Sequence, residues 1–172
     1  TALLWLCCGR VEAFVPHRTA SHRTAPHPTS PHLGMAQYPD AAEFENDVQA
    51  LGGEVQHGID ATQLHKCAEL VEKCPWDAVV FNFPHVGFGI KDQLKNIRAN
   101  QEMLKGFLAS AAEMVHDTGE VHITIKKGEP YDSWKVVKLG LEIPGLKLKT
   151  AFDFVAGQYP KYRHRRTWGY EA

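Results

Sequence analysis

The sequence has 172 residues, of which 44% are hydrophobic and 23% charged, and its formal net charge at pH 7 is −1. These values are typical of one globular domain, and they exclude wholesale disorder, a collagen-like repeat and a highly charged nucleic-acid tail. No apolar run approaches the ~18 residues that a transmembrane helix requires, so we expect no membrane partner.

The small net charge hides an uneven distribution along the chain. Residues 35–120 contain six basic and fourteen acidic residues, whereas residues 121–172 contain ten basic and five acidic ones. Two interpretations remain open. The basic end forms a face that attracts phosphate, or the two regions are simply solvated helix faces of opposite sign.

Residues 1–34 differ from the rest of the chain. A short apolar run, Thr1 to Cys8, precedes a decaying five-residue repeat that places a histidine at positions 17, 22, 27 and 32. We expect residues 1–34 to be a disordered or targeting-like low-complexity segment, followed by one domain over residues 35–172. A plastid-type leader and a mis-joined or truncated translation remain alternatives. The four cysteines show no C-x-x-C spacing, so no metal site is expected.

From residue 35 onward, helical and strand patterns alternate. Hydrophobic periodicity predicts helices over residues 40–51, 61–73, 93–116 and 131–142. It predicts strands over residues 54–59, 78–81, 121–125 and 146–154. The run from Ala78 to Phe81 is continuously apolar, which is typical of a strand buried on both faces. Alternating strands and helices indicate right-handed crossovers and a largely parallel sheet.

Two of the predicted strands end in residues that can carry chemistry. Asp60 follows the strand at 54–59, and Asn82-Phe83-Pro84-His85 follows the apolar strand. Ligands of such sheets bind beyond the carboxyl ends of the strands. Asn-x-Pro after a buried strand occurs in methyltransferases that act on planar nitrogen, where an amide supplies both a donor and an acceptor. The structural alternatives are a tight turn capped by Asn82, and a helix cap at Asp60.

Several longer blocks occur in a fixed order between residues 38 and 169. They are YPDAAEFENDVQALGGEVQHGIDATQL, FNFPHVGFG, IRANQEMLKGFLASAAEM, GEVHITIKKGEPYDSW and YPKYRHRRTWG. Together they resemble the class I, S-adenosylmethionine-dependent rRNA (uridine-N3)-methyltransferases of the large ribosomal subunit. The resemblance implies an α/β, Rossmann-like class I methyltransferase sheet with helices on both faces. The family's opening strand and its Gly-Glu-Gly-Asn/Asp-Phe-Ser-Phe-Ser loop have no clear counterpart here. The first strand–helix unit is therefore expected to be missing, and Leu3 to Leu6 is the nearest match to the strand.

The resemblance also implies roles for individual residues. Asp60, Asn82 and Phe83 would bind the cofactor, S-adenosyl-L-methionine, and Asn82, Pro84 and His85 would form the catalytic site. His85 is the titratable group beside the target, so it is a candidate base for the uridine N3 proton, or else a positioning or phosphate-contacting residue. The implied function is methylation of uridine N3 in large-subunit rRNA. The alternatives are a catalytically impaired RNA-binding remnant and a methyltransferase of another RNA base.

The basic C-terminal end supplies the candidate RNA contacts. These are Arg163, Arg165 and Arg166, together with Lys126 and Tyr131 after another strand end. Alternatively, the arginines brace the acidic middle of the same domain. The expected partner is large-subunit rRNA, with no membrane and no metal. The expected location is the nucleolus or cytoplasm, or the plastid if residues 1–34 are a leader.

Overall fold

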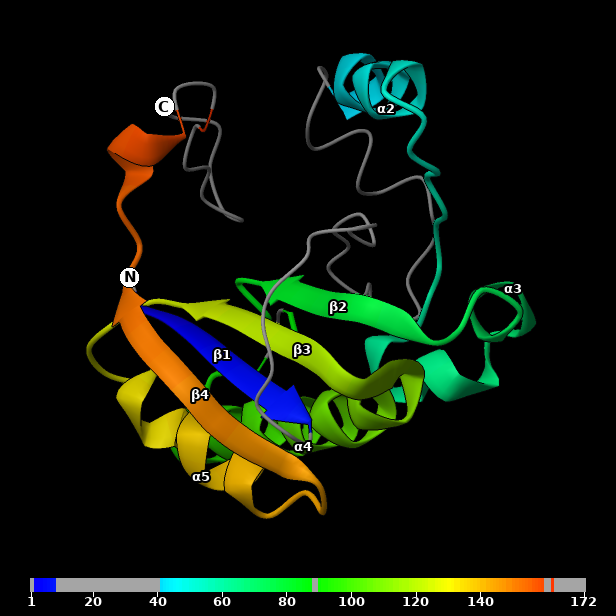
Figure 1. The fold of residues 1–172 in the computed structure, drawn as a ribbon. Helices are drawn as coiled ribbons and strands as arrows, with labels where there is room; N and C mark the ends of the chain where they lie inside the picture. Colours follow the sequence, from blue (N-terminus) through cyan, green and yellow to red (C-terminus); the bar gives the residue numbers. More distant parts are fainter. Residues whose placement is uncertain (1, 9–40, 88–89, 160–161, 163–172) are drawn as a thin grey trace.

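A computed structural model of the chain describes residues 2–8, 41–87, 90–159 and 162 (Figure 1). The histidine repeat, the predicted cap at Asp40 and the arginines at 163, 165 and 166 lie outside the described residues. The strands are β1 (Ala2–Cys8), β2 (Trp76–Asn82), β3 (Val115–Ile125) and β4 (Leu146–Asp153). The α-helices are α2 (Ala41–Ala50), α3 (Ala68–Val71), α4 (Gln93–Met114) and α5 (Val136–Leu141). Short 3-10 helices are η1 (Ala61–Lys66), η2 (Asp132–Trp134) and η3 (Ala156–Gln158).

The four strands form one mixed sheet in the order β2-β3-β1-β4 (Figure 1). β2 pairs in parallel with β3, whereas β1 pairs antiparallel with both β3 and β4. It follows that β2, β3 and β4 run in one direction and β1 runs in the other. The predicted parallel arrangement is therefore correct for three strands and wrong for β1.

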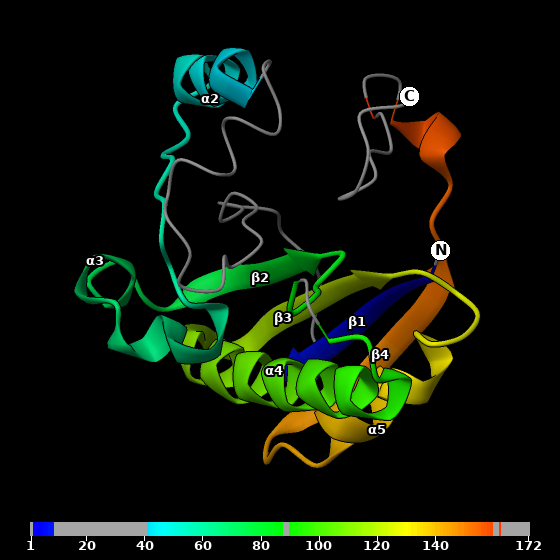
Figure 2. The same cartoon turned by 180° about the vertical axis from the view of Figure 1, so that it is seen from behind.

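The core lies between the sheet and the two helices α4 and α5, which pack on one face (Figure 2). In β2 the buried side chains alternate, because Val79 and Phe81 point toward α4 and their neighbours are less buried. The rings of Phe81 and Phe107 lie 4.7 Å apart. From α4, the buried apolar side chains are those of Leu104, Phe107, Leu108, Ala111 and Met114. The prediction that this strand is buried on both faces is wrong, because the packed helices cover only one face.

Helix α2 confirms the helix predicted over residues 40–51, but its apolar side chains are not buried in the core. None of its residues is buried, and Phe44 is 52% exposed. The helix ends where Gly52 adopts a φ of +81°, a conformation that glycine permits, and Gly53 donates a hydrogen bond to Val48 O over 2.8 Å. The expected arrangement of helices packed on both faces is therefore not found in the described part of the chain.

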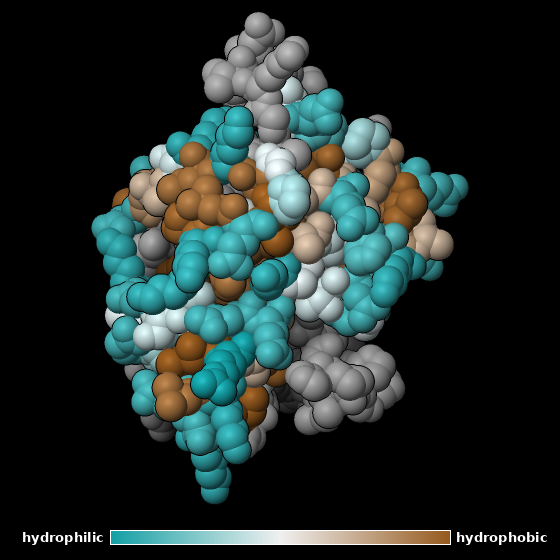
Figure 3. Space-filling model, turned by 90° about the horizontal axis from the view of Figure 1, so that it is seen from below, coloured by the Kyte–Doolittle hydropathy of each residue, from teal (hydrophilic) through white to brown (hydrophobic). Residues whose placement is uncertain are grey.

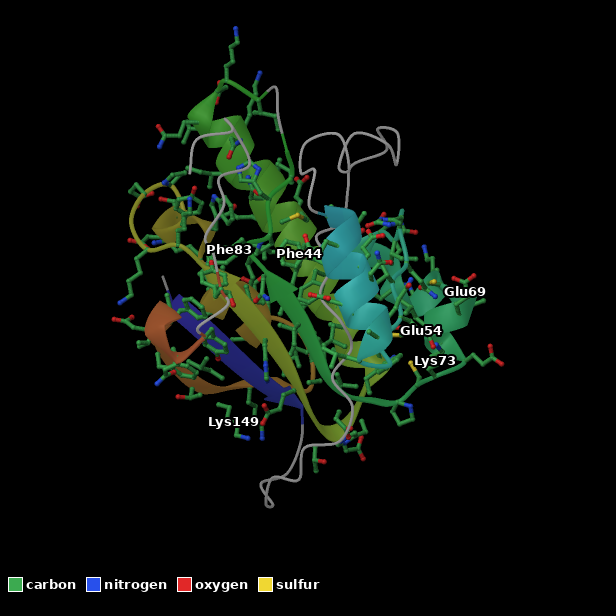
Figure 4. The ribbon with its side chains drawn as sticks, turned by 90° about the horizontal axis from the view of Figure 1, so that it is seen from above. Phe44, Glu54, Glu69, Lys73, Phe83 and Lys149 are labelled. Atoms are coloured by element: carbon green, nitrogen blue, oxygen red, sulfur yellow. The ribbon has the colours of Figure 1, made fainter. Side chains whose placement is uncertain are left out.

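Several predicted elements differ from the structure. Residues 54–59 form no strand, because no described strand pairs with them, and Glu54 instead forms an ion pair with Lys73 beside α3 (Figure 4). The helix predicted over 61–73 is divided into η1 and α3. The helix predicted over 131–142 is divided at Lys135, whose φ is +53°. Helix α4 ends at Met114, earlier than predicted, because the chain enters β3 directly.

The first residues also depart from expectation. Ala2–Cys8 form strand β1, although they lie inside the segment predicted to be low-complexity and disordered. Leu3 to Leu6, the nearest match to the family's opening strand, therefore is a strand. The division of the chain at residues 34 and 35 stays a prediction, because the intervening residues lie outside the described ranges.

Candidate functional site

Strands β2 and β3 end side by side, and this edge holds the Asn82 turn. Asn82 lies opposite Thr124 in the parallel register. The Thr124 hydroxyl donates to Asn82 Oδ1 over 2.6 Å, and Thr124 is only 2% exposed. This buried hydrogen bond fixes the rotation of the Asn82 amide, so its donor and acceptor atoms have defined directions. Sequence reasoning missed Thr124, although the alternation of Val121, Ile123 and Ile125 places it on the opposite face.

The residue after Asn82 has an unusual backbone conformation. Phe83 adopts a φ of +49°, which is rare for a residue with a side chain, and its N–H donates to Thr124 O over 2.8 Å. Such conformations cost about 1–3 kcal/mol and cluster at functional sites. The next residue, Pro84, is buried. Figure 4 shows Phe83 just beyond the end of β2. Thr124 thus holds the turn through both its side chain and its carbonyl.

A second residue that the sequence reasoning missed, Asn100 of α4, supports the loop after the turn. It is fully buried, and its Oδ1 accepts the Val86 N–H over 3.0 Å. Its Nδ2 donates to Asn96 O at 2.9 Å and to Asn96 Oδ1 at 3.0 Å. The sequence did contain a signal for this role, since Asn100 is a polar residue within the apolar stripe of the helix, between Ile97 and Leu104. A polar side chain that is buried in this way requires hydrogen-bond partners.

We therefore expect Asn100→Ala to destabilise the fold by about 1–3 kcal/mol, because it leaves the Val86 N–H without its acceptor. Urea unfolding followed by circular dichroism measures this change. The exposed residue Glu102 lies on the same helix, so Glu102→Ala is the matched control and should change stability little. Equal effects of the two substitutions would show that Asn100 does not hold the loop.

His85 lies at the same edge, exposed on one side and packed against Trp134 on the other. The two ring centroids are 5.7 Å apart. The Gly87 N–H donates to His85 Nδ1 over 2.9 Å. Burial, and then the charge of Lys126, lower the pKa of His85 below its usual value. His85 is therefore held neutral at pH 7. Because Nδ1 accepts a hydrogen bond, Nε2 carries the proton in that neutral form.

Lys126 and Tyr131 join this group from the segment after β3. The Lys126 ammonium lies 5.9 Å from the centre of the Tyr131 ring, and that ring contacts Trp134 edge-on at 5.0 Å. Trp134 is fully buried and separates Tyr131 from His85. The structure thus brings together the predicted residues Asn82, Phe83, Pro84, His85, Lys126 and Tyr131.

Asp60 is placed differently. It caps η1, where Oδ1 accepts the Thr62 N–H at 2.9 Å and the Thr62 hydroxyl at 2.7 Å. Its Oδ2 accepts from Gln63 Nε2 at 3.2 Å. The capping interpretation is therefore confirmed, and the carboxylate keeps acceptor capacity on Oδ2, which accepts only one of these hydrogen bonds. Its expected position after a strand is wrong, since residues 54–59 form none.

Helix η1 is attached to α4 away from the Asn82 turn. A Cβ on Gly106 would lie 2.9 Å from Thr62 Cβ, so glycine permits this close approach. Further along α4, the Ser110 hydroxyl accepts the His65 N–H at 3.1 Å and bonds to His65 Nδ1 at 2.8 Å. Along the helix axis, Gly106 lies about 9 Å beyond Asn100, which holds the loop after the turn. The described contacts thus attach η1, which Asp60 caps, and the loop after the Asn82 turn to different parts of α4.

The functional edge, by which we mean the sheet edge at the carboxyl ends of β2 and β3, does not include the carboxyl end of β1. Ala2 pairs with Ile125, and Cys7 pairs with Glu120. The carboxyl end of β1 therefore lies at the edge of the sheet opposite to Asn82 and Lys126. Although Leu3 to Leu6 forms a strand, it does not lead the chain into the functional edge as the family's opening strand would.

No described helix is long and apolar enough to span a membrane. Within the same ranges, no group of three or more His, Cys, Asp or Glu side chains is arranged to hold a metal ion.

The fold and the site define a mixed α/β domain whose polar side chains gather beyond the carboxyl ends of parallel strands, where such sheets bind ligands. Residues 18–166 match the BMT5-like family, described as rRNA (uridine-N3-)-methyltransferase, and the chain belongs to this family. No solved structure gives a significant match to the chain.

Relatives in plants and yeast support this assignment. An uncharacterized protein of Arabidopsis thaliana is 35% identical over 136 residues, which cover 77% of this chain and 64% of that protein. The 25S rRNA (uridine(2634)-N(3))-methyltransferase of Saccharomyces cerevisiae is 32% identical over 125 residues, or 54% of this chain and 37% of the enzyme. The heavy metal-associated isoprenylated plant protein 41 of Arabidopsis thaliana is 33% identical, over 76% of this chain and 25% of that protein. The chain thus spans less than two thirds of each of these relatives.

Proposed function

We propose that the protein is an S-adenosyl-L-methionine-dependent methyltransferase with a Rossmann-like sheet, and that it methylates N3 of a uridine in large-subunit rRNA. Membership of the family and the activity named for the yeast relative support this proposal. The observation that carries it within this chain is the Asn82 amide, which Thr124 holds at the carboxyl edge of the parallel strands.

Asn82 orients the uracil ring in this proposal. The uracil imide presents N3–H between two carbonyl oxygens, and the Asn82 Nδ2 group can donate to one of them while Oδ1 is held by Thr124. The turn of Phe83 and the buried Pro84 limit the directions from which the ring can approach. Alignment of the reacting nitrogen with a methyl donor contributes up to ~7–11 kcal/mol in favourable cases.

His85 acts as a hydrogen-bond donor rather than as the base. Its Nδ1 accepts from Gly87, so the Nε2–H of the neutral ring is the group that can reach a ligand. Donation to a uracil carbonyl oxygen stabilises the negative charge that develops as the N3 proton leaves to solvent. The lowered pKa agrees with this role, because a neutral ring keeps one N–H for donation and Nδ1 for Gly87.

In a chain that carries the family's opening strand and Gly-rich loop, this role predicts that His85→Gln retains methyl transfer within about threefold, because the glutamine amide can place an N–H close to the position of Nε2. By contrast, His85→Ala should lose about tenfold. Because the His85 pKa lies below its usual value, the parent rate should fall only when pH drops below that lowered pKa, as the ring protonates and loses the Gly87 hydrogen bond. A Gln variant as slow as the Ala variant would instead support the base role.

The described residues fit part of a cofactor site. Asn82 and Phe83 border the functional edge, and the Asp60 carboxylate can accept from the adenine or ribose of S-adenosyl-L-methionine, as the resemblance implies. η1, which Asp60 caps, and the loop after the Asn82 turn attach to separate parts of α4, and no described loop lies where the family's Gly-rich loop would approach the methionine part. When bound, the cofactor supplies the methyl group, and we assign no further step to it.

The RNA surface in this proposal combines Lys126 and Tyr131 with Arg163, Arg165 and Arg166. Tyr162, which directly precedes the arginines, packs edge-on against Phe154 at 5.0 Å and donates its backbone N–H to Tyr159 O at 2.8 Å. This aromatic cluster anchors the chain just before the basic end. Arginine suits phosphate because its guanidinium group provides paired donors.

Transfer of a tritiated methyl group from S-adenosyl-L-methionine to large-subunit rRNA, by the chain joined to the family's opening strand and Gly-rich loop, tests the function. Nucleoside analysis of the product should give N3-methyluridine, and another methylated base would support the alternative substrate. RNA binding without transfer would support the impaired remnant, which the direction of β1 favours. An rRNA substrate places the protein in the nucleolus or cytoplasm, whereas a plastid location depends on residues 1–34.

A further inference from the structure

A hollow opens beside the functional edge, between the end of β3 and α5. Its volume is about 630 Å³, within the ~300–1,000 Å³ range of ligand pockets. Its apolar lining comes from Ile125, Val136, Val137 and Leu141. Its basic lining comes from Lys126, Lys127, Lys135 and Lys138. The hollow thus combines an apolar surface with several cations.

The charge of this lining is positive overall. Two acidic residues, Asp132 and Glu142, also line the hollow, against the four lysines. Glu142 forms an ion pair at 3.2 Å with Lys105, which lies outside it. Lys135 and Lys138 make no ion pair with any residue in the described ranges. These two ammonium groups are therefore available to an anionic ligand.

The hollow lies next to the group of side chains around His85. Tyr131 lines it and packs against Trp134, which packs against His85 of the turn. Lys126 lines it too, and its charge acts on His85. Lys126 and Tyr131 therefore link the hollow to the side chains around His85.

Part of the apolar lining is exposed. Leu141 is 58% exposed, and Figure 3, which views the molecule from the side of α4 and α5, shows hydrophobic patches separated by hydrophilic side chains. An unstacked base offers an apolar face to such a surface, and its phosphates repeat along the strand at the spacing of the nucleotides.

We propose that this hollow binds one unpaired nucleotide next to the target uridine, with its base against Leu141 and its flanking phosphates on Lys135 and Lys138. The inference rests on the proposed function, because it takes the RNA strand to continue from the uridine at Asn82. Single-stranded RNA suits the hollow better than an acidic peptide, since each nucleotide brings a flat apolar ring together with its charge.

The first test is binding of a short fluorescein-labelled single-stranded RNA to the full chain, measured by anisotropy over a range of salt. The double variant Lys135→Gln/Lys138→Gln should weaken binding about fivefold or more and flatten the slope of log affinity against log salt by ~1–1.5 units. The double variant Lys66→Gln/Lys147→Gln changes the net charge equally at exposed positions outside the hollow. It should leave the slope nearly unchanged.

The second test separates the base from the phosphates. Leu141→Asn should weaken RNA binding about fivefold, because a base loses its apolar contact, but it should leave binding of inorganic tripolyphosphate unchanged. The lysine double variant should weaken both ligands. Because the substituted side chains are exposed, thermal melting should show all variants folded.

Three outcomes would overturn the inference. Equal weakening by the two lysine double variants would show only general electrostatic attraction. An unchanged RNA affinity for Leu141→Asn would show that no base occupies the hollow. Competition by polyglutamate that depends on Leu141 would identify an acidic peptide as the occupant. In each case RNA binding by the parent chain would persist, whereas its complete absence would contradict the proposed function itself.

Discussion

Asn82→Ala is expected to remove most methyl transfer while leaving the fold nearly unchanged. The substitution deletes the amide proposed to orient the uracil imide, and losing such a hydrogen bond costs at least ~1 kcal/mol, or about fivefold in rate. The loss of alignment adds to this value, so we expect a decrease of about tenfold or more. The measurement is tritium transfer by a chain that carries the family's opening strand and Gly-rich loop, with circular dichroism to monitor folding.

The matched control is a substitution of Thr124, the hydrogen-bond partner of the Asn82 amide. Thr124→Val keeps the volume of the side chain and removes only the hydroxyl that donates to Asn82. It should lower the rate less than Asn82→Ala does, because the amide remains but loses its fixed rotation. If Asn82→Ala kept activity within about threefold, the assignment of the Asn-x-Pro turn to substrate orientation would be wrong.

A polypeptide of these 172 residues is expected to bind S-adenosyl-L-methionine weakly or not at all. The carboxyl end of β1 lies at the edge of the sheet opposite to Asn82, so β1 itself does not end beside the turn. Asp60 is attached to α4 through η1, about 9 Å along the helix from the residue that supports the turn. The described residues therefore offer contacts for the adenine side of the cofactor and for the target base, and we expect the methionine side to lack its usual loop.

Calorimetric titration tests this expectation, and a micromolar dissociation constant would contradict it. Joining the family's opening strand and Gly-rich loop to the chain should restore binding. A graft of the same length and composition with a scrambled loop is the control. Restoration by both grafts would show that the added chain, rather than the loop, supplies the missing contacts.

The sequence by itself determined the features that depend on residues close to one another along the chain. The apolar run before Asn82 identified β2, the periodicity from Gln93 onward identified α4, and alternation around Ile123 identified β3. Each of these signals lies within one element, because helix and strand periodicities record which side chains share a face. The Asn82 turn was found in the same way, as polar residues that directly follow a buried strand.

Only the tertiary structure decided which residues support that turn and which strands pair. Thr124 and Asn100 lie on other elements, so their hydrogen bonds to the turn depend on strand register and helix packing. Residues 54–59 alternate between apolar and polar side chains as a strand does, but they form no strand. A strand requires a neighbouring strand to satisfy its backbone hydrogen-bonding groups. The direction of β1 likewise depends on pairing with β3 and β4, and an apolar run carries no information about direction.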